Sequence, residues 1–140
     1  MKAYIKYAAA AAAGAIAAGS IVYAQAPASP PRAVISIYRA APGHQEALLQ
    51  WLAQQERIAA ASGQSAGQLY AHTDGDSWDY LLVAPTTTDA QDQAFEASAA
   101  KMGLPSGPKA GLELRKHIES HTDTYVIGPM TAAQLLDRLK

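Results

Sequence analysis

The sequence predicts an α+β domain in which four strands form one sheet and helices pack against it. Four runs rich in branched and aromatic residues have the composition of strands: 33–39, 67–72, 78–84 and 124–128. Longer segments with apolar residues at helical spacing lie between them, at 44–62 and 90–102. The order of elements is therefore strand, helix, strand, strand, helix, strand.

The first strand, Ala33–Arg39, leads through Ala41-Pro42-Gly43 into the first helix. Proline suits the first turn of a helix, and Gly63 is placed to end this one. The apolar residues of the helix fall on one stripe, which predicts its buried face: Leu48, Trp51, Leu52, Ile58 and Ala59.

The second and third strands, Gly67–His72 and Trp78–Ala84, are predicted to form a hairpin. Asp74-Gly75 lies between them, and glycine accepts the positive φ that a tight turn needs. Both faces of the strands carry mainly apolar side chains. A sheet with one face in water would alternate polar and apolar residues, so both faces of this sheet are expected to be covered.

Thr86–Asp89 offers capping side chains for the helix at 90–102, and Gly103–Gly111 is predicted to interrupt the chain. Three further elements are expected: a helix at 112–120, a strand at 124–128 and a short terminal helix at 132–139 capped by Thr131. The order β-α-β-β-α-β is that of a ferredoxin-like unit, with its helices on one face. A second copy of the chain is expected to cover the other face, which predicts a homodimer.

Residues 1–24 have the pattern of a secretory signal peptide, followed by a Pro-rich linker at 25–32 and the domain at 33–140. Lys2 and Lys6 precede an uncharged, Ala-rich stretch that is less apolar than a typical membrane span, although a membrane anchor is the alternative. Cleavage is expected after Ala24, or alternatively after Ala26. The protein is then periplasmic or secreted, with no membrane association after cleavage.

The composition excludes several classes of function. The chain has no cysteine, which removes disulfides, thiol nucleophiles and cysteine metal sites. It carries 11 basic and 12 acidic residues without a basic run, so we expect no nucleic-acid partner. Neither a Gly-rich phosphate loop nor a G-x-S-x-G motif is present, so nucleotide use and serine hydrolysis are unsupported.

The segment AVISIYRAAPGHQEALLQWL, together with Trp78-Asp79-Tyr80 and HTDTYVIGP, resembles the dimeric α/β-barrel superfamily. This superfamily includes antibiotic-biosynthesis monooxygenase-like and stress-responsive barrel domains, of which this chain would be an exported version. The resemblance spans about residues 33–129. It implies two sheets from two subunits packed into a barrel, often with a small-molecule cavity between sheet and helices. Members include cofactor-free oxygenases, haem enzymes, isomerase-like enzymes and proteins without known activity, so no single chemistry is implied.

Two of the histidines have the spacing of a metal site. His117 and His121 are four residues apart near the end of the predicted helix at 112–120, and Glu113 lies one turn earlier. Two imidazoles and a carboxylate suit a divalent metal, but Ile118 stands where an H-E-x-x-H motif has its glutamate. Capping of the helix end is the alternative, and we expect neither a metal nor another cofactor.

His72 and His121 are the candidate general bases, because imidazole titrates near neutral pH. His72 shares a strand face with Tyr70, although it also fits a structural position at the strand end. His121 precedes the last strand, where Asp123 could orient it. Six side chains are candidates to line a ligand cavity, with core or interface packing as the alternative for the aromatic ones: Tyr38, Tyr70, His72, Trp78, Tyr80 and His121.

Taken together, these features predict an exported, homodimeric barrel that binds a small apolar or aromatic molecule. The first alternative is a cofactor-independent oxygenase or isomerase acting on an aromatic or polyketide-like compound, with His72 or His121 as base. The second is a haem- or metal-binding barrel that uses His117 or His121. The sequence leaves open whether the protein is an enzyme.

Overall fold

The computed structural model describes residues 31–140; the predicted signal peptide and most of the predicted linker lie outside the described residues. Four strands form one antiparallel sheet in the order β2-β3-β1-β4. The strands are β1 (Arg32–Ala40), β2 (Gln68–Ala71), β3 (Tyr80–Pro85) and β4 (Ile118–Ile127). With helices after β1 and β3, this is the ferredoxin-like α+β fold that the sequence predicts.

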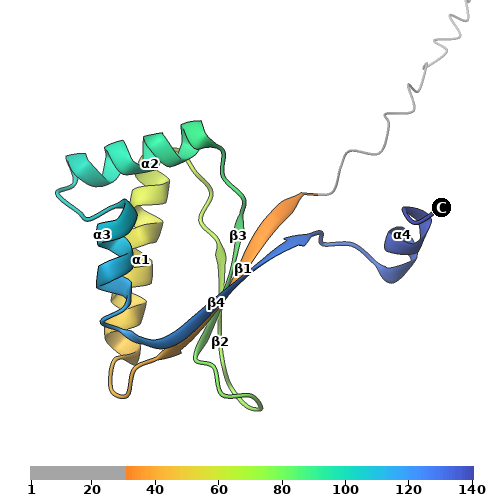
Figure 1. Ribbon diagram of the computed structural model, residues 1–140, viewed down its shortest axis with the longest axis horizontal. Helices are drawn as coiled ribbons and strands as arrows, with labels where there is room; N and C mark the ends of the chain where they lie inside the picture. Colours follow the sequence, from red (N-terminus) through yellow and green to blue (C-terminus); the bar gives the residue numbers. More distant parts are fainter. Residues whose placement is uncertain (1–30) are drawn as a thin grey trace, which may run out of the picture.

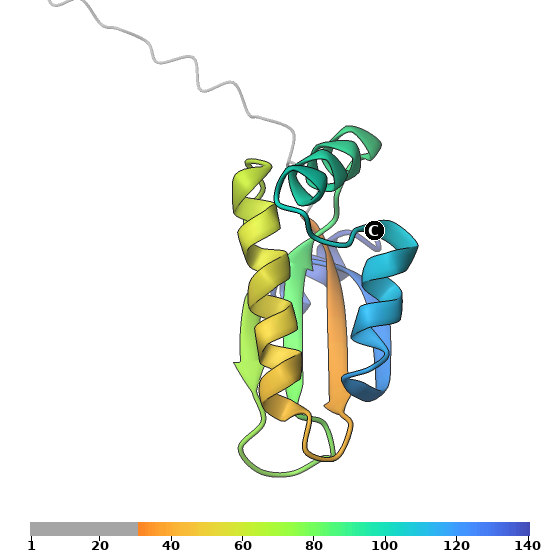
Figure 2. The same ribbon diagram turned by 90° about the vertical axis from the view of Figure 1, so that its left-hand side faces the viewer.

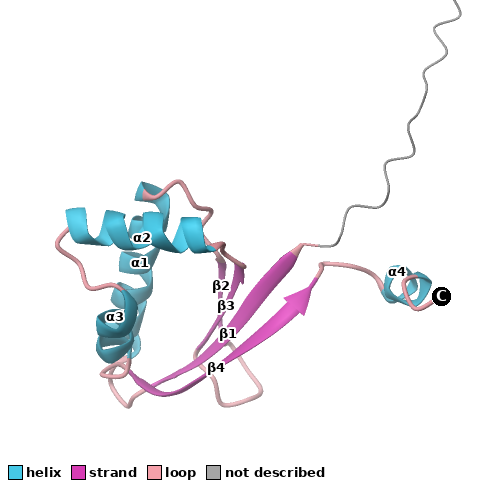
Figure 3. Cartoon of the chain, turned by 45° about the horizontal axis from the view of Figure 1, so that its top comes forward, coloured by secondary structure: helices cyan, strands magenta, loops and turns pink. Residues whose placement is uncertain are grey.

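The helices are α1 (Gln45–Ala61), α2 (Asp89–Lys101), α3 (Gly107–Leu114) and α4 (Ala132–Asp137). Helices α1, α2 and α3 lie on one side of the sheet (Figure 1). Figure 2 shows α1 and α3 side by side in front of the strands, with α2 across one end. Helix α4 lies apart from them, beyond the end of β4 (Figure 3). No helix within residues 31–140 is long and apolar enough to cross a bilayer.

Helix α1 has the buried stripe that its apolar spacing predicts. Leu48, Leu52 and Ile58 are buried, and Leu48 and Ile58 have no exposed surface at all. The helix ends at Ala61, and Gly63 follows with a φ of 74°, a conformation that glycine adopts without strain. The predicted stop signal is therefore confirmed, whereas Pro42 lies in the turn before the N-cap residue His44 and not in the first turn of the helix as predicted.

The core forms where α1 and α3 pack onto the middle of the sheet. Tyr38 of β1 and Tyr80 of β3 are paired across the two strands and both are buried against the helices. The main cluster of buried residues is Tyr38, Ala40, Leu48, Leu52, Tyr80 and Leu114, with Trp51, Leu82 and Ile118 packed against it. Residues of β1 at even positions therefore face the helices, and Ile35 and Ile37 face the opposite side.

The β2–β3 connection is longer than the predicted tight turn. β2 ends at Ala71 and β3 begins at Tyr80, so Asp74-Gly75 lies inside a loop that spans 72–79. The prediction was wrong about the turn because the residues that end the loop hydrogen-bond to β1.

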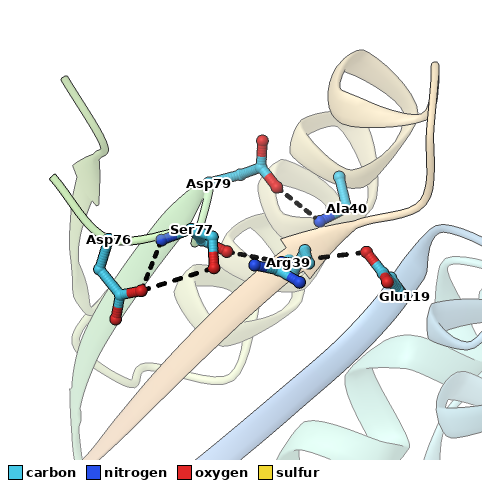
Figure 4. Close-up of polar contacts among 6 residues, drawn as sticks. All are labelled: Arg39, Ala40, Asp76, Ser77, Asp79 and Glu119. Carbon is cyan, nitrogen blue, oxygen red and sulfur yellow. Dashed lines mark hydrogen bonds and ion pairs between the residues drawn. The ribbon is translucent and has the colours of Figure 1, made fainter. Parts of the chain in front are cut away.

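Asp79 and Arg39 make these bonds (Figure 4). The Asp79 N–H donates to the Tyr38 carbonyl oxygen at 2.8 Å, and the Asp79 carboxylate accepts the Ala40 N–H at 2.7 Å. The Arg39 guanidinium donates to the Ser77 carbonyl oxygen. These bonds join the β2–β3 loop to the C-terminal end of β1, within the same sheet.

The segment after α2 also differs from the prediction. The helix expected at 112–120 is α3, at Gly107–Leu114, because Pro108 occupies its first turn, where a missing N–H costs nothing. The last strand begins at Ile118, instead of at 124, and pairs with β1 along its whole length. His117 therefore follows a helix and His121 lies in a strand, so the prediction that they share a helix face was wrong.

The capping predicted from the segment Thr86–Asp89 and from Thr131 is confirmed. Thr88 accepts a hydrogen bond from the Gln91 N–H, and the Gln91 side chain accepts one from the Thr88 N–H in return. Thr131 and Gln134 form the same reciprocal pair at the start of α4. Such capping boxes are encoded within four residues, which is why the sequence alone reveals them.

The sheet face opposite the helices is apolar and is uncovered within residues 31–140. At its centre, Ile37 pairs with Leu81 and Ile35 pairs with Val83 across β1 and β3. Ile37 remains 36% exposed. The sequence predicts that a second copy covers this face, and the structure identifies which residues form it.

Candidate ligand-binding site

A cavity of about 270 Å³ lies between the sheet and the helices α1 and α2. Its walls come from β1, β3, α1, α2 and the segments that join α1 to β2 and β3 to α2. Among its apolar lining residues are Leu52, Ala59, Leu82, Ala84 and Phe95. Ligand sites are typically concave and mostly apolar with a few polar groups, and span about 300–1,000 Å³. This cavity therefore suits a small molecule of one or two rings.

The α1–β2 connection closes one side of the cavity. A Cβ at Gly67 would lie 2.6 Å from Leu82 Cδ1 and 2.9 Å from the Val83 carbonyl oxygen, so only glycine allows this close approach to β3. Gln64 donates from Nε2 to the Gln91 carbonyl oxygen of α2 at 2.7 Å. This bond links the α1–β2 connection to the first turn of α2, and both residues line the cavity.

Two residues of α1 that line the cavity, Trp51 and Gln55, each have a buried N–H donor without an acceptor. Trp51 and Gln55 both line it and are one helical turn apart. Trp51 Nε1 and Gln55 Nε2 are covered by protein atoms, and neither has a partner within residues 31–140. A buried donor without an acceptor is unfavourable, so these two are notable.

Tyr38 forms part of the cavity wall and is only 6% exposed. Burial raises the pKa of its phenol, the negative charge of Asp123 adds to this, and the neighbouring Ser36 hydroxyl acts in the opposite direction. The pKa of Tyr80 is also raised, by burial and by the charge of Asp79. Both phenols are therefore neutral and able to donate hydrogen bonds near pH 7.

A polar cluster lies on the helix-facing side of β1 and β4, next to Tyr38. Ser36, 8% exposed, donates from Oγ to Asp123 Oδ1 at 2.6 Å. The other carboxylate oxygen of Asp123 is 3.6 Å from Nε2 of His121. The His121 ring stacks on the Tyr38 ring, with centroids 6.1 Å apart and planes 14° apart. The expected proximity of Asp123 to His121 is present, and both side chains remain partly open to solvent.

The other predicted cavity residues lie elsewhere. His72 is in the β2–β3 loop and packs on Trp78, with ring centroids 5.0 Å apart. Tyr70 faces the uncovered side of the sheet, where it pairs with Leu81. Tyr80 belongs to the core. Of the six candidates, the structure brings Tyr38, Tyr80 and His121 to one face and separates the rest from them.

The three residues considered for a metal site are not together. Glu113 in α3 pairs with Lys116 at 2.7 Å, and the His117 ring is 5.9 Å from the His44 ring at the start of α1. His121 lies in β4, beside Tyr38. Within the described part of the chain, no three His, Asp or Glu side chains are placed to hold a metal ion.

The cavity residues of α1, α2 and the α1–β2 connection were not predicted as such from the sequence. Trp51 was expected to be core, and Gln55, Gln64 and Phe95 were not among the candidates, which were strand aromatics and histidines. One signal was available: Gln55 falls one turn after Trp51 on a helix stripe that is otherwise apolar.

No protein-family model matches the chain, and no curated protein matches its sequence. Solved structures with a similar fold include a dimeric ferredoxin-like protein of unknown function from Thermobifida fusca, at 12% identity and a TM-score of 0.47, covering 72% of this chain and 93% of that one. A NIPSNAP family protein from Agrobacterium tumefaciens has 13% identity and a TM-score of 0.48, over 70% and 92% of the two chains.

A third similar structure is SnoaB, described as a cofactor-independent oxygenase from Streptomyces nogalater. Its identity is 18% and its TM-score 0.45, over 74% of this chain and 98% of SnoaB.

Proposed function

We propose that this protein binds a small, largely apolar molecule in the cavity between α1, α2 and the sheet. The cavity itself carries the proposal: it is bounded on several sides, lined mainly by apolar side chains and reached by a small number of polar groups. A molecule with one or two rings would replace water against Leu82 and Phe95, and apolar burial would supply most of the binding free energy.

The test is a thermal-shift screen with small aromatic and alicyclic compounds against three forms of the protein. Ala59 lines the cavity, so Ala59→Leu fills part of it; Ala60 is the next residue of α1 and is exposed, so Ala60→Leu is the matched control. A ligand at 100 times its Kd stabilises the folded state by about 2.7 kcal/mol, which raises Tm by several degrees. We expect Ala59→Leu to lose these shifts and Ala60→Leu to keep them. Equal shifts in all three forms would place binding elsewhere.

The protein is proposed to act as a homodimer. The uncovered sheet face presents a continuous apolar surface formed by Ile35, Ile37, Leu81 and Val83. Soluble monomers rarely leave such a surface in water, and a second copy of the same surface covers it with two-fold symmetry. The cavity lies on the other side of the sheet, so dimerisation leaves it accessible.

A second candidate function is proton transfer by His121, as an isomerase or cofactor-independent oxygenase would need. The observation that favours it is the arrangement of Ser36, Asp123 and His121 beside Tyr38. Ser36 fixes the Asp123 carboxylate, which can stabilise the imidazolium that forms when His121 accepts a proton. The Tyr38 hydroxyl is neutral near pH 7 and can donate a hydrogen bond to negative charge that develops on the ligand.

Deuterium exchange tests this second function. Compounds that raise Tm are incubated with the protein in D₂O and examined by mass spectrometry for uptake of deuterium at carbon. We expect uptake with the wild type, strong loss in His121→Gln, and no change in His44→Gln, since His44 is at the exposed start of α1. A compound that binds without taking up deuterium would contradict proton transfer and support a binding function alone.

A further inference from the structure

One charged side chain, Glu56 of α1, stands among the described residues that line the cavity, and none of the others is acidic or basic. Leu52 precedes it by one turn, Ala59 follows it by about one turn, and all three line the cavity, so Glu56 belongs to the cavity-lining face of the helix. The side chain is partly exposed, so a ligand can reach it. Within residues 31–140 its carboxylate makes neither an ion pair nor a hydrogen bond.

The helix ends beside the cavity make its surroundings more negative. The C-terminal half of α1 lines the cavity, and the last turn of this helix, where the helix dipole is negative, has no basic residue. The first turn of α2, at the positive end of its dipole, carries Asp89 and Asp92. Two arginines close in sequence to lining residues line other grooves: Arg57 between α1 and α3, and Arg32 beside the end of β4. The cavity should therefore attract a cation and repel an anion.

The rest of the lining suits the apolar body of an organic cation. Leu52, Leu82 and Phe95 supply hydrocarbon surface, and burial against them would provide most of the binding free energy. An inorganic cation such as Ca²⁺ needs six or more oxygen ligands, and the cavity offers a single carboxylate. An ammonium group needs only one carboxylate partner when the body that carries it is held by apolar contacts.

We propose that the cavity selects a protonated amine with an apolar body of one or two rings, and that Glu56 is the residue that pairs with its ammonium group. This inference rests on the proposed function of the cavity and specifies its ligand class. It does not depend on His121 or on proton transfer.

The experiment compares three compounds with the same indane ring system. At neutral pH 2-aminoindane is a cation, 2-indanol is uncharged and indane-2-carboxylate is an anion. Affinities are measured by calorimetry for the wild type, Glu56→Gln, Glu56→Lys and Glu46→Gln. Glu46→Gln is the matched control, because it removes the same charge from the exposed first turn of the same helix.

We expect the wild type to bind 2-aminoindane about fivefold more tightly than 2-indanol, the factor that a partly screened ion pair provides, and to bind the carboxylate most weakly. Glu56→Gln should bind the amine and the alcohol equally, Glu56→Lys should prefer the carboxylate, and Glu46→Gln should keep the wild-type order. Raising NaCl from about 0.1 M to about 1 M should reduce the preference of the wild type for the amine, because the Debye length falls from about 10 Å to about 3 Å.

The uncharged alcohol separates failure of this inference from failure of the proposed function. Equal binding of amine and alcohol by the wild type, or an unchanged amine preference in Glu56→Gln, overturns the amine assignment and leaves the cavity as an apolar site. Loss of 2-indanol binding in Glu56→Gln overturns it too, since Glu56 would then maintain the cavity instead of selecting a charge. Binding of none of the three compounds by the wild type contradicts both this inference and the proposed function.

Discussion

Tyr38 lies between the cavity and the polar cluster formed by Ser36, Asp123 and His121. Its side chain forms part of the cavity wall, and its ring stacks on His121. Burial and the charge of Asp123 together hold its hydroxyl in the neutral form. The same residue therefore belongs to the candidate binding site and to the candidate proton-transfer site.

The raised pKa values of Tyr38 and Tyr80 predict a loss of stability at alkaline pH. Above pH 10, the usual pKa of tyrosine, the unfolded chain releases these protons while the folded protein still retains them. The stabilising contribution is therefore complete below pH 10 and is lost as the pH rises through the folded pKa values. Urea denaturation between about pH 9 and about pH 11 should show this fall, and Tyr38→Phe should make it shallower.

Tyr125→Phe is the control for this measurement, because Tyr125 is 79% exposed. It should follow the pH dependence of the wild type. If Tyr38→Phe and Tyr125→Phe give the same curve as the wild type, burial of Tyr38 does not perturb its ionisation.

Among the elements, β1 has the largest role because it is central in the sheet and pairs with both β3 and β4. Its C-terminal end is fixed by the β2–β3 loop. The Asp79 carboxylate accepts the Ala40 N–H at the point where the register of β1 against β4 shifts, so it satisfies a backbone donor at an irregularity in the ladder.

Asp79→Ala should destabilise the fold by about 1–3 kcal/mol, the cost of leaving the partly buried Ala40 N–H without an acceptor. Asp74→Ala is the matched control, since Asp74 is exposed in the same loop and should change the free energy of unfolding by less than about 0.5 kcal/mol. Urea denaturation of both variants measures the difference. Equal stabilities would mean that water replaces the carboxylate at Ala40.

For the molecule as a whole, the sheet has one face covered by helices and one left open. Leu82 faces the helices, whereas Leu81 and Val83 face the open side, a distinction that follows from the pairing of β3 with β1. The uncovered face is therefore the surface through which we expect two copies to associate.

Light scattering should give about twice the monomer mass for the wild type, and Val83→Asp should shift it to the monomer mass and lower Tm. Leu82→Asp places a charge on the helix side and should prevent folding instead. Ala97→Asp, on the exposed surface of α2, should leave both the dimer and Tm unchanged. A Val83→Asp protein that remains dimeric with the wild-type Tm would show that this face is not the interface.

The last prediction for the whole molecule is its export, and the predicted signal peptide lies outside the described part of the chain. We propose cleavage after Ala24, so intact mass spectrometry of protein from the exported fraction should match a chain that starts at Gln25, or alternatively at Pro27. A mass that retains Met1–Tyr23 would instead support a membrane anchor.

Local patterns were sufficient for the order of elements, for both threonine caps, for the buried stripe of α1 and for the apolar character of both sheet faces. Each of these depends on residues within a few positions of one another, where helical or strand periodicity and hydrogen bonding to the nearest backbone groups decide the outcome. The error at α3 and β4 had a local cause as well: Pro108 starts a helix as readily as it interrupts one, and strand pairing with β1 then extended β4 back to Ile118.

Contacts between side chains far apart in the sequence could not be predicted from these local patterns. Strand parity groups Tyr38 with Ser36, but it does not say which face the helices cover, and that choice placed Tyr38 against the cavity and Tyr70 on the opposite side. The bond between Ser36 and Asp123 joins residues 87 positions apart, through the pairing of β1 with β4. Proximity of this kind is set by the packing of whole elements, because no local pattern encodes the partner of a residue across a sheet.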